Sequence, residues 1–182
     1  LTELSTIIKN YVISNEQVNK VKPWAAFSLI GRPKPVRAPT LESNLLQFAQ
    51  QRLLETRSLE SMEEILLALD SLSMDDQIII LKDTICNHKK IIRETKTLVD
   101  LYVARDLQGI VEFNNQPHYD EAVFERFMQN ILYKRNIRML ERIKKEFDKG
   151  DVFVAVGASH LADKKGLLNV LANSGYNVTS LY

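Results

Sequence analysis

Apolar residues recur at intervals of three and four over most of the chain, which is the spacing of one face of an α-helix. The pattern is clearest over residues 74–103 and over residues 120–148. Shorter stretches with the same spacing lie over residues 1–29, 44–55 and 62–73. We therefore expect a helix-rich protein, in which Asp120 caps the start of the long helix and Gly150 follows its end.

The C-terminal part of the chain has a different pattern. Residues 151–156, with the sequence DVFVAV, are apolar on both faces, as in a central strand of a parallel sheet. A helix is expected over residues 164–174, and residues 176–182, YNVTSLY, are expected to form a second strand. This strand–helix–strand order predicts a right-handed crossover between parallel strands. With a third short strand over residues 56–61, the expected fold is α/β, helix-rich, with a small and mostly parallel sheet.

Residues 31–40, GRPKPVRAPT, interrupt the helical pattern with three prolines and three basic residues. Proline at this density is incompatible with a helix interior or a central strand. We expect an exposed loop, with a basic recognition element as the alternative. The total length of 182 residues suits a single domain that spans residues 1–182.

Composition excludes several classes of protein. The net charge of +1 gives no field that would attract nucleic acid. Cys86 is the single cysteine, so the chain has no internal disulfide framework. No run approaches the roughly 20 apolar residues of a membrane-spanning helix. Because the chain begins LTELSTIIKN, without Met or a cleavable leader, we expect either a processed protein or a fragment of a longer one.

His160 is the first candidate for chemistry. In open parallel sheets, ligands bind beyond the carboxyl ends of the strands. His160 follows the strand expected over residues 151–156, and Gly157 is expected to let the chain turn tightly between them. An imidazole in this position is a candidate metal ligand or proton carrier. The alternative is a histidine that caps the next helix or packs against a loop.

Arg135 is the second candidate, because it lies within the apolar face of the long helix, with Asn136 at the edge of that face. A guanidinium that faces a core must be paired, so a carboxylate or an anionic ligand is expected beside it. Glu60, at the end of the short strand expected over residues 56–61, is a candidate partner, ligand or base. A purely structural salt bridge remains the alternative.

The other titratable residues have ordinary explanations. Glu63 and Glu64 open a helix, where the helix dipole favours acidic side chains. His88 is expected on a solvated helix face, and His118 in a loop. The sequence contains no His-Glu-x-x-His motif, no glycine-rich phosphate loop and no serine in a nucleophile elbow.

Taken in order, these motifs resemble the TraB/GumN family. They are Leu-Glu-x-x-Glu-Glu at residues 59–64, Arg-Asn at residues 135–136, and FVAVGASHL followed by GLLNVLANSGYNVTSLY at the C-terminus. The family's Gly-Ala-x-His and later positions are matched by Gly157, Ala158, His160, Gly166, Leu171, Gly175, Tyr176 and Val178. The segment KPWAAFSL matches as well, so the resemblance covers most of Lys22–Tyr182 and corresponds to the C-terminal two-thirds of the family.

The resemblance implies an α/β fold related to Tiki-type metalloproteases and erythromycin-esterase-like proteins. It also implies a metal-dependent hydrolase, for example a peptidase. The implied cofactor is a divalent metal such as Zn or Mn, and the implied substrate is a peptide or a small molecule. By position, His160 would be a metal ligand, Glu60 the acid, and Arg135 and Asn136 the Arg-Asn pair. The family suggests the cell envelope, the periplasm or secretion. A non-catalytic protein that binds a peptide or restrains a peptide signal is the alternative.

The chain departs from the family pattern in one important way. The family carries two Gly-x-x-His motifs, and only the one that contains His160 is present here. The expected sheet would therefore lack its first strands, and half of the metal site would be missing, whereas a catalytic metal usually needs about three protein ligands. We expect little activity from this chain alone. The expected partners are the missing N-terminal segment or, as a homodimer, a second copy pairing through the exposed sheet edge. Glu42 also stands where the family has Asp.

Overall fold

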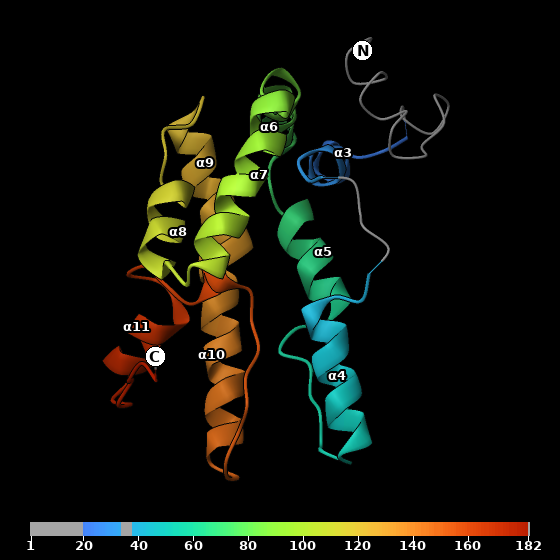
Figure 1. Cartoon of the computed structure of the whole chain (residues 1–182). Coiled ribbons are helices and arrows are strands. Elements are labelled where there is room, and N and C mark those ends of the chain that lie inside the picture. The colour runs from blue at the N-terminus through green and yellow to red at the C-terminus, as the bar shows by residue number, and fades with distance from the viewer. Residues whose placement is uncertain (1–19, 34–37, 182) are drawn as a thin grey trace.

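The structure is a computed structural model that describes residues 20–33 and 38–181. Within these residues the fold is all-helical (Figure 1). The α-helices are α3 (Pro23–Ile30), α4 (Leu41–Gln51), α5 (Met62–Asp70), α6 (Met74–Cys86), α7 (His88–Val103), α8 (Leu107–Asn114), α9 (Glu121–Met128), α10 (Lys134–Phe147) and α11 (Leu167–Asn173). The π-helix η2 (Gln129–Tyr133) joins α9 to α10, and the short 3-10 helix η3 (Ala158–His160) precedes α11.

The predicted α/β fold is wrong for the described residues, because none of the three expected strands forms. Residues 151–156 are extended but pair with no other strand, and the described part of the second segment, residues 176–181, is likewise non-helical and exposed. Residues 56–61 are irregular, with a bend at residues 59–60 before α5. An extended segment becomes a strand only when a neighbour supplies its ladder of hydrogen bonds, and no described segment does so here. The crossover helix itself is present as α11.

The long helix is confirmed, with an unexpected feature in its middle. The Asp120 carboxylate accepts a hydrogen bond from the backbone N–H of Val123 at 3.0 Å and so caps α9. One continuous helical rod then runs through α9, η2 and α10. The π-helical turn of η2 inserts into this rod, and such turns shift the faces of a helix relative to one another. Gly150, with a φ of 139°, follows the end of the rod.

The hydrophobic core cluster lies along α10. Met139, Leu140 and Ile143 are buried there against Leu167 of α11. The cluster is covered by the partly buried side chains of Leu59, Phe147, Val154, Val156, Val170 and Leu171. Residues 151–156 therefore lie on α10 as a cover of one apolar side, while Phe153 on the opposite side is 81% exposed. The cover explains why this segment is apolar without being a central strand.

A second group of helices packs through α3 and α6. Ala26, Phe27 and Ile30 form the buried face of α3, and Phe27 meets the Phe127 ring of α9 edge to face at 6.1 Å. Arg126 of α9 holds the buried Asp76 of α6 in a two-point ion pair, with nitrogen–oxygen distances of 2.8 and 2.7 Å. These contacts connect the N-terminal helices to the long rod.

Several details of the expected helices differ from the structure. The helical stretch 74–103 is divided into α6 and α7 at Asn87, whose amide bonds back to Asp83 and ends the first helix. The helix over residues 44–55 begins earlier, at Leu41, with Thr40 as its N-cap. Within the expected loop 31–40, the described residues lie outside helices, and residues 34–37 lie outside the described part, as do residues 1–19 of the first expected helix. Among the described residues, no helix is both long and apolar enough to cross a membrane.

The core cluster predicts a stability difference between two isoleucines of α10. Ile143→Ala should lower the free energy of unfolding by about 2–4 kcal/mol, because Ile143 is 2% exposed and its loss leaves a cavity. Ile137→Ala, on the same helix at 55% exposure, should change it by less than about 1 kcal/mol. Urea unfolding followed by circular dichroism measures both, and equal losses would show that α10 is oriented differently.

Candidate functional site

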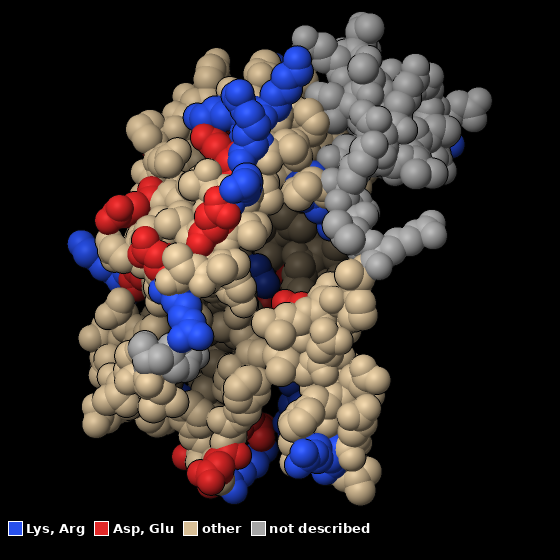
Figure 2. All heavy atoms as spheres, in the orientation of Figure 1, with Lys and Arg blue, Asp and Glu red and all other residues tan. Residues whose placement is uncertain are grey.

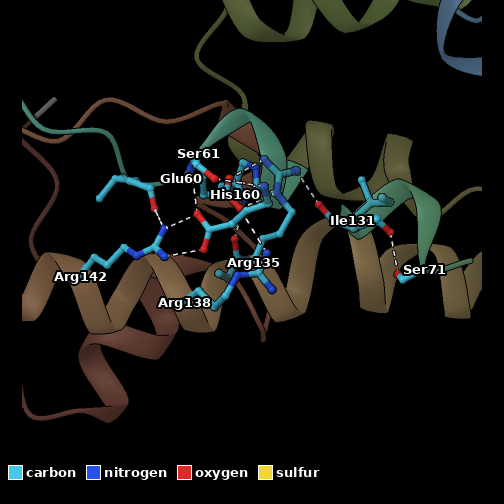
Figure 3. A network of polar contacts seen from close by, with 12 residues as sticks. Glu60, Ser61, Ser71, Ile131, Arg135, Arg138, Arg142 and His160 are labelled. Atoms are coloured by element: carbon cyan, nitrogen blue, oxygen red, sulfur yellow. Dashed lines mark hydrogen bonds and ion pairs between the residues drawn. The ribbon is translucent and has the colours of Figure 1, made fainter. Parts of the chain in front are cut away.

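Three arginines of α10 share one face of the helix, because Arg135, Arg138 and Arg142 follow one another at intervals of three and four residues. We call them the arginine row. The row faces the segment 59–64, which leads into α5, and the side chains of the two elements meet in one polar network (Figure 3). The surface is hollowed beside α5, and acidic and basic side chains are visible inside the hollow (Figure 2).

Glu60 is the centre of this network. Its side chain is only 4% exposed, and Arg135 donates to both of its oxygens, from Nε at 2.9 and 3.1 Å and from Nη2 at 2.7 Å. The remaining Nη1 of Arg135 donates to the carbonyl of Ile131 at 2.7 Å. The structure thus brings together the two residues that the sequence marked as candidate partners. Both oxygens of this carboxylate are therefore engaged by Arg135, and the side chain is held in one position.

Glu64 and Arg142 form the second pair of the network. Arg142 donates to both Glu64 oxygens, at 2.8 and 2.5 Å, and to the carbonyl of Leu59. Glu64 also completes a capping box, in which Ser61 and Glu64 each bond the other's backbone N–H. The hydrogen bonds from Arg142 and from Ser61 lower the pKa of Glu64 to about 2. The sequence explained Glu64 by the helix dipole alone and missed this pairing with α10.

His160 lies beside the Glu60–Arg135 pair and is held by Asn136. The His160 Nδ1 and the Asn136 Oδ1 are 2.6 Å apart, and Asn136 is completely buried. The Asn136 amide nitrogen donates to the carbonyl of Lys165 at 2.8 Å, so the amide oxygen must be the atom that faces the imidazole. An amide oxygen only accepts, and Nδ1 therefore carries the proton. Nε2 is left with its lone pair.

The surroundings also favour the neutral imidazole. Burial lowers the pKa of His160 below its usual 6.5, and the positive charge of Arg135 lowers it further, while Glu60 acts in the opposite direction. At neutral pH the ring is thus uncharged, in the tautomer whose Nε2 accepts a proton or binds a metal. The sequence identified both His160 and Asn136 but gave no sign that one positions the other.

The turn that carries His160 is built differently from the expected one. Gly157 has a φ of −60° and a ψ of 142°, which any residue adopts, so the turn does not depend on glycine there. Gly166 is the glycine that the geometry requires, because a Cβ at that position would lie 1.8 Å from the carbonyl oxygen of Ala162. Asp163 in the same loop accepts from the Tyr133 hydroxyl at 3.2 Å, and burial together with this carboxylate raises the pKa of Tyr133 to about 12.

The described residues do not by themselves fit a resident catalytic metal. Nε2 of His160 is one available ligand atom, but both oxygens of Glu60 are occupied by guanidinium groups. No group of three or more His, Cys, Asp or Glu side chains suited to a metal ion occurs in the part of the chain that the structure describes. What the cluster offers is a neutral imidazole next to fixed charges of both signs.

The two remaining histidines lie away from this cluster. His118 stacks on Phe124 with ring centroids 3.3 Å apart, and its Nε2 faces the carbonyl of Asn114 at 3.5 Å. The Nδ1 of His88 is buried without a hydrogen-bond partner among the described residues. Arg138 and Arg142 are the residues of the cluster that the sequence reasoning missed. Their spacing from Arg135 in RNIRMLER was the available signal, since it places all three on one helical face.

Removing the negative charge of Glu60 should destabilise the fold. Glu60→Gln leaves the guanidinium of Arg135, which is 15% exposed, without its counter-charge, and we expect a loss of about 3 kcal/mol in the free energy of unfolding. Glu63→Gln removes the same charge from an exposed position three residues away and should cost less than about 0.5 kcal/mol. Urea titration compares the two variants, and a neutral effect of Glu60→Gln would contradict a buried pair.

The lowered pKa of Glu64 predicts a specific pH dependence. Because the carboxyl ionises more readily in the folded state, its contribution is present above the unfolded pKa of about 4.5 and is lost as the pH falls toward about 2. Wild type and Glu64→Gln should therefore differ most in urea midpoint near about pH 6 and converge as the pH falls to about 2. A difference that stays constant over this range would show that the Arg142 contact does not form in solution.

Comparison with known proteins gives one match. The model of the TraB/PrgY/gumN family matches residues 1–180. Searches of curated proteins and of solved structures found no match. The family predicted from the motifs is confirmed, whereas its expected extent is corrected, because the match covers nearly the whole chain and not only a C-terminal part that starts near Lys22. The chain belongs to the TraB/PrgY/gumN family.

Proposed function

We propose that this chain carries a hydrolytic site for peptide or small-molecule substrates, in which His160 is the proton carrier. The observation that supports the proposal is the 2.6 Å contact between His160 Nδ1 and Asn136 Oδ1, which leaves the lone pair of Nε2 available. A general base must be unprotonated at the working pH, and the burial that lowers the pKa of His160 keeps its imidazole neutral.

In the proposed reaction, water adds to the scissile carbonyl carbon while Nε2 accepts one of its protons. The imidazolium then returns that proton to the leaving group as the scissile bond breaks. Asn136 serves both states, because its oxygen accepts from Nδ1–H before and after the transfer. The charge of Glu60 favours the imidazolium, and Arg135 holds the Glu60 carboxylate in place.

Family membership suggests a metal-dependent form of this chemistry, with Zn or Mn as the metal. Such an ion would lower the pKa of a bound water, and His160 Nε2 is the one atom of the cluster that is free to bind it. The cluster holds no second free ligand, since Glu60 is engaged by Arg135 and Arg138. No step of the proposed reaction is therefore assigned to a metal.

The tautomer and the pKa of His160 test the site without a known substrate. In a nitrogen-15 NMR titration, the His160 signals should show a protonated Nδ1 and a bare Nε2, with a pKa below 6.5. His88→Gln and His118→Gln assign the signals, since the chain contains 3 histidines. An Nε2–H tautomer, or a pKa at or above 6.5, would refute the arrangement.

Activity tests the function itself. The intact protein should cleave members of an internally quenched peptide library, and His160→Ala should lower kcat/KM by about 10² or more, as expected for loss of a general base. His118→Ala, which removes an imidazole outside the cluster, should retain wild-type activity. Metal analysis of the same samples shows whether an ion co-purifies with the wild-type protein and whether it is lost in His160→Ala. If His160→Ala cleaves and binds metal as well as wild type, the assignment is wrong.

Peptide binding without catalysis is the second candidate. It is favoured by residues 151–156, whose backbone is extended and makes no hydrogen bond with another described residue. An extended segment with unpaired backbone N–H and C=O groups can pair with an extended peptide, as in β-strand addition. In this case a labelled peptide would bind with the same affinity before and after a chelator and in His160→Ala, and no cleavage would be seen. Pairing of two copies through the same segment would instead appear as a dimer in light scattering.

A further inference from the structure

Arg138 has donors that the fold does not use. Its Nε is buried and has no hydrogen-bond partner among the described residues. Within the described part of the chain, its nearest carboxylate contact joins Nη2 to Glu60 Oε1 at 3.4 Å, well beyond the roughly 2.7–2.9 Å of a charge-assisted hydrogen bond. Buried donors are nearly always satisfied in native proteins, so an arginine in this state requires an explanation.

The neighbouring carboxylates make their short contacts with the other two arginines. Both oxygens of Glu60 already accept from Arg135, at distances between 2.7 and 3.1 Å. Both oxygens of Glu64 already accept from Arg142, at 2.5 and 2.8 Å. The arginine row thus contributes three guanidinium groups to two carboxylates, and Arg138, in the middle, holds the positive charge in excess.

Arg138 is also accessible to a ligand. Its side chain is 36% exposed, compared with 15% for Arg135. It projects from α10 toward Glu60 (Figure 3), the carboxylate that Arg135 holds and whose charge acts on His160. An anion that approaches the terminal nitrogens of Arg138 would therefore arrive at the Glu60 end of the cluster that contains His160. Because the site is partly shielded from water, its attraction for an anion is stronger than that of a lone surface arginine.

We propose that Arg138 binds a carboxylate group of the ligand, such as the C-terminus or an acidic side chain of a peptide. The other two members of the arginine row already take carboxylates in two-point contacts, and a carboxylate ligand would complete the third pair in the same manner. Arg138 would thereby determine specificity by holding an acidic substrate at the cluster that contains His160. The role in substrate specificity rests on the proposed function, whereas carboxylate binding itself does not.

Binding of small probes tests this inference without any requirement for catalysis. N-acetyl-dialanine, which has a free carboxylate, should shift the Arg138 Nε–H signal in a nitrogen-15 NMR titration, while its C-terminal amide should not. Arg138→Gln should weaken binding of the acid about tenfold or more, since a charge-assisted contact is lost. Lys134→Gln removes one positive charge from an exposed position on the same helix and should leave binding unchanged. The matched control separates a specific contact from a general effect of charge.

Three results would overturn the proposal. They are equal binding of the acid and the amide, unchanged binding in Arg138→Gln, and tighter binding of inorganic phosphate than of the acid, which would identify a phosphate site instead. Arg138→Lys keeps the charge but loses the planar pair of donors, so it should bind several-fold more weakly and serves if Arg138→Gln does not fold. If the probe binds as expected while His160→Ala retains hydrolysis, the carboxylate site stands and the proposed function fails.

Discussion

The ion pair between Glu60 and Arg135 is the interaction on which the rest of the site depends. Two charges are removed from water at the junction of segment 59–64 and α10, and this costs several kcal/mol for each ion before the pair and its hydrogen bonds offset it. The Ile131 carbonyl accepts from Nη1, the remaining nitrogen of the Arg135 guanidinium. Once this pair is formed, segment 59–64 has one position on α10. The Ser61 capping box and the Arg142–Glu64 pair then fix the direction in which α5 leaves.

Burial and the same pair together determine the chemical state of His160. Burial lowers the pKa of the imidazole most, Arg135 lowers it further, and Glu60 acts in the opposite direction, so the neutral form is favoured. Orientation comes from a different source, because Asn136 selects the tautomer through a hydrogen bond that carries no charge. The charge state of the ring and its tautomer therefore have separate causes. The first comes from burial and the nearby charges, and the second comes from the hydrogen bond to Asn136.

The sequence predicted which residues lie together better than it predicted the secondary structure around them. Glu60, Arg135, Asn136 and His160 were all singled out, and the structure gathers them in one cluster. The sequence could indicate the pairing of Arg135 because a guanidinium on an apolar helix face must be paired with a carboxylate or another anion. The predicted sheet failed because an apolar run such as residues 151–156 shows only that a segment is covered. Here α10 covers one side of the segment. Sequence periodicity does not show whether a helix or a neighbouring strand provides this cover.

Arg138 shows why such a cluster is better explained by recognition than by stability alone. A fold selected only for stability would gain by replacing an under-bonded, partly buried arginine with an apolar residue of similar size, as replacement of buried ion pairs in other proteins has shown. Helix α10 instead keeps the third guanidinium between two satisfied ones, at 36% exposure and within reach of Glu60. Unsatisfied polar groups are tolerated at sites where a ligand satisfies them. The free energy lost by leaving the donor without a partner in the free protein is recovered when the ligand binds. The positive charge in excess is then the part of the site that remains unfinished until an acidic ligand binds.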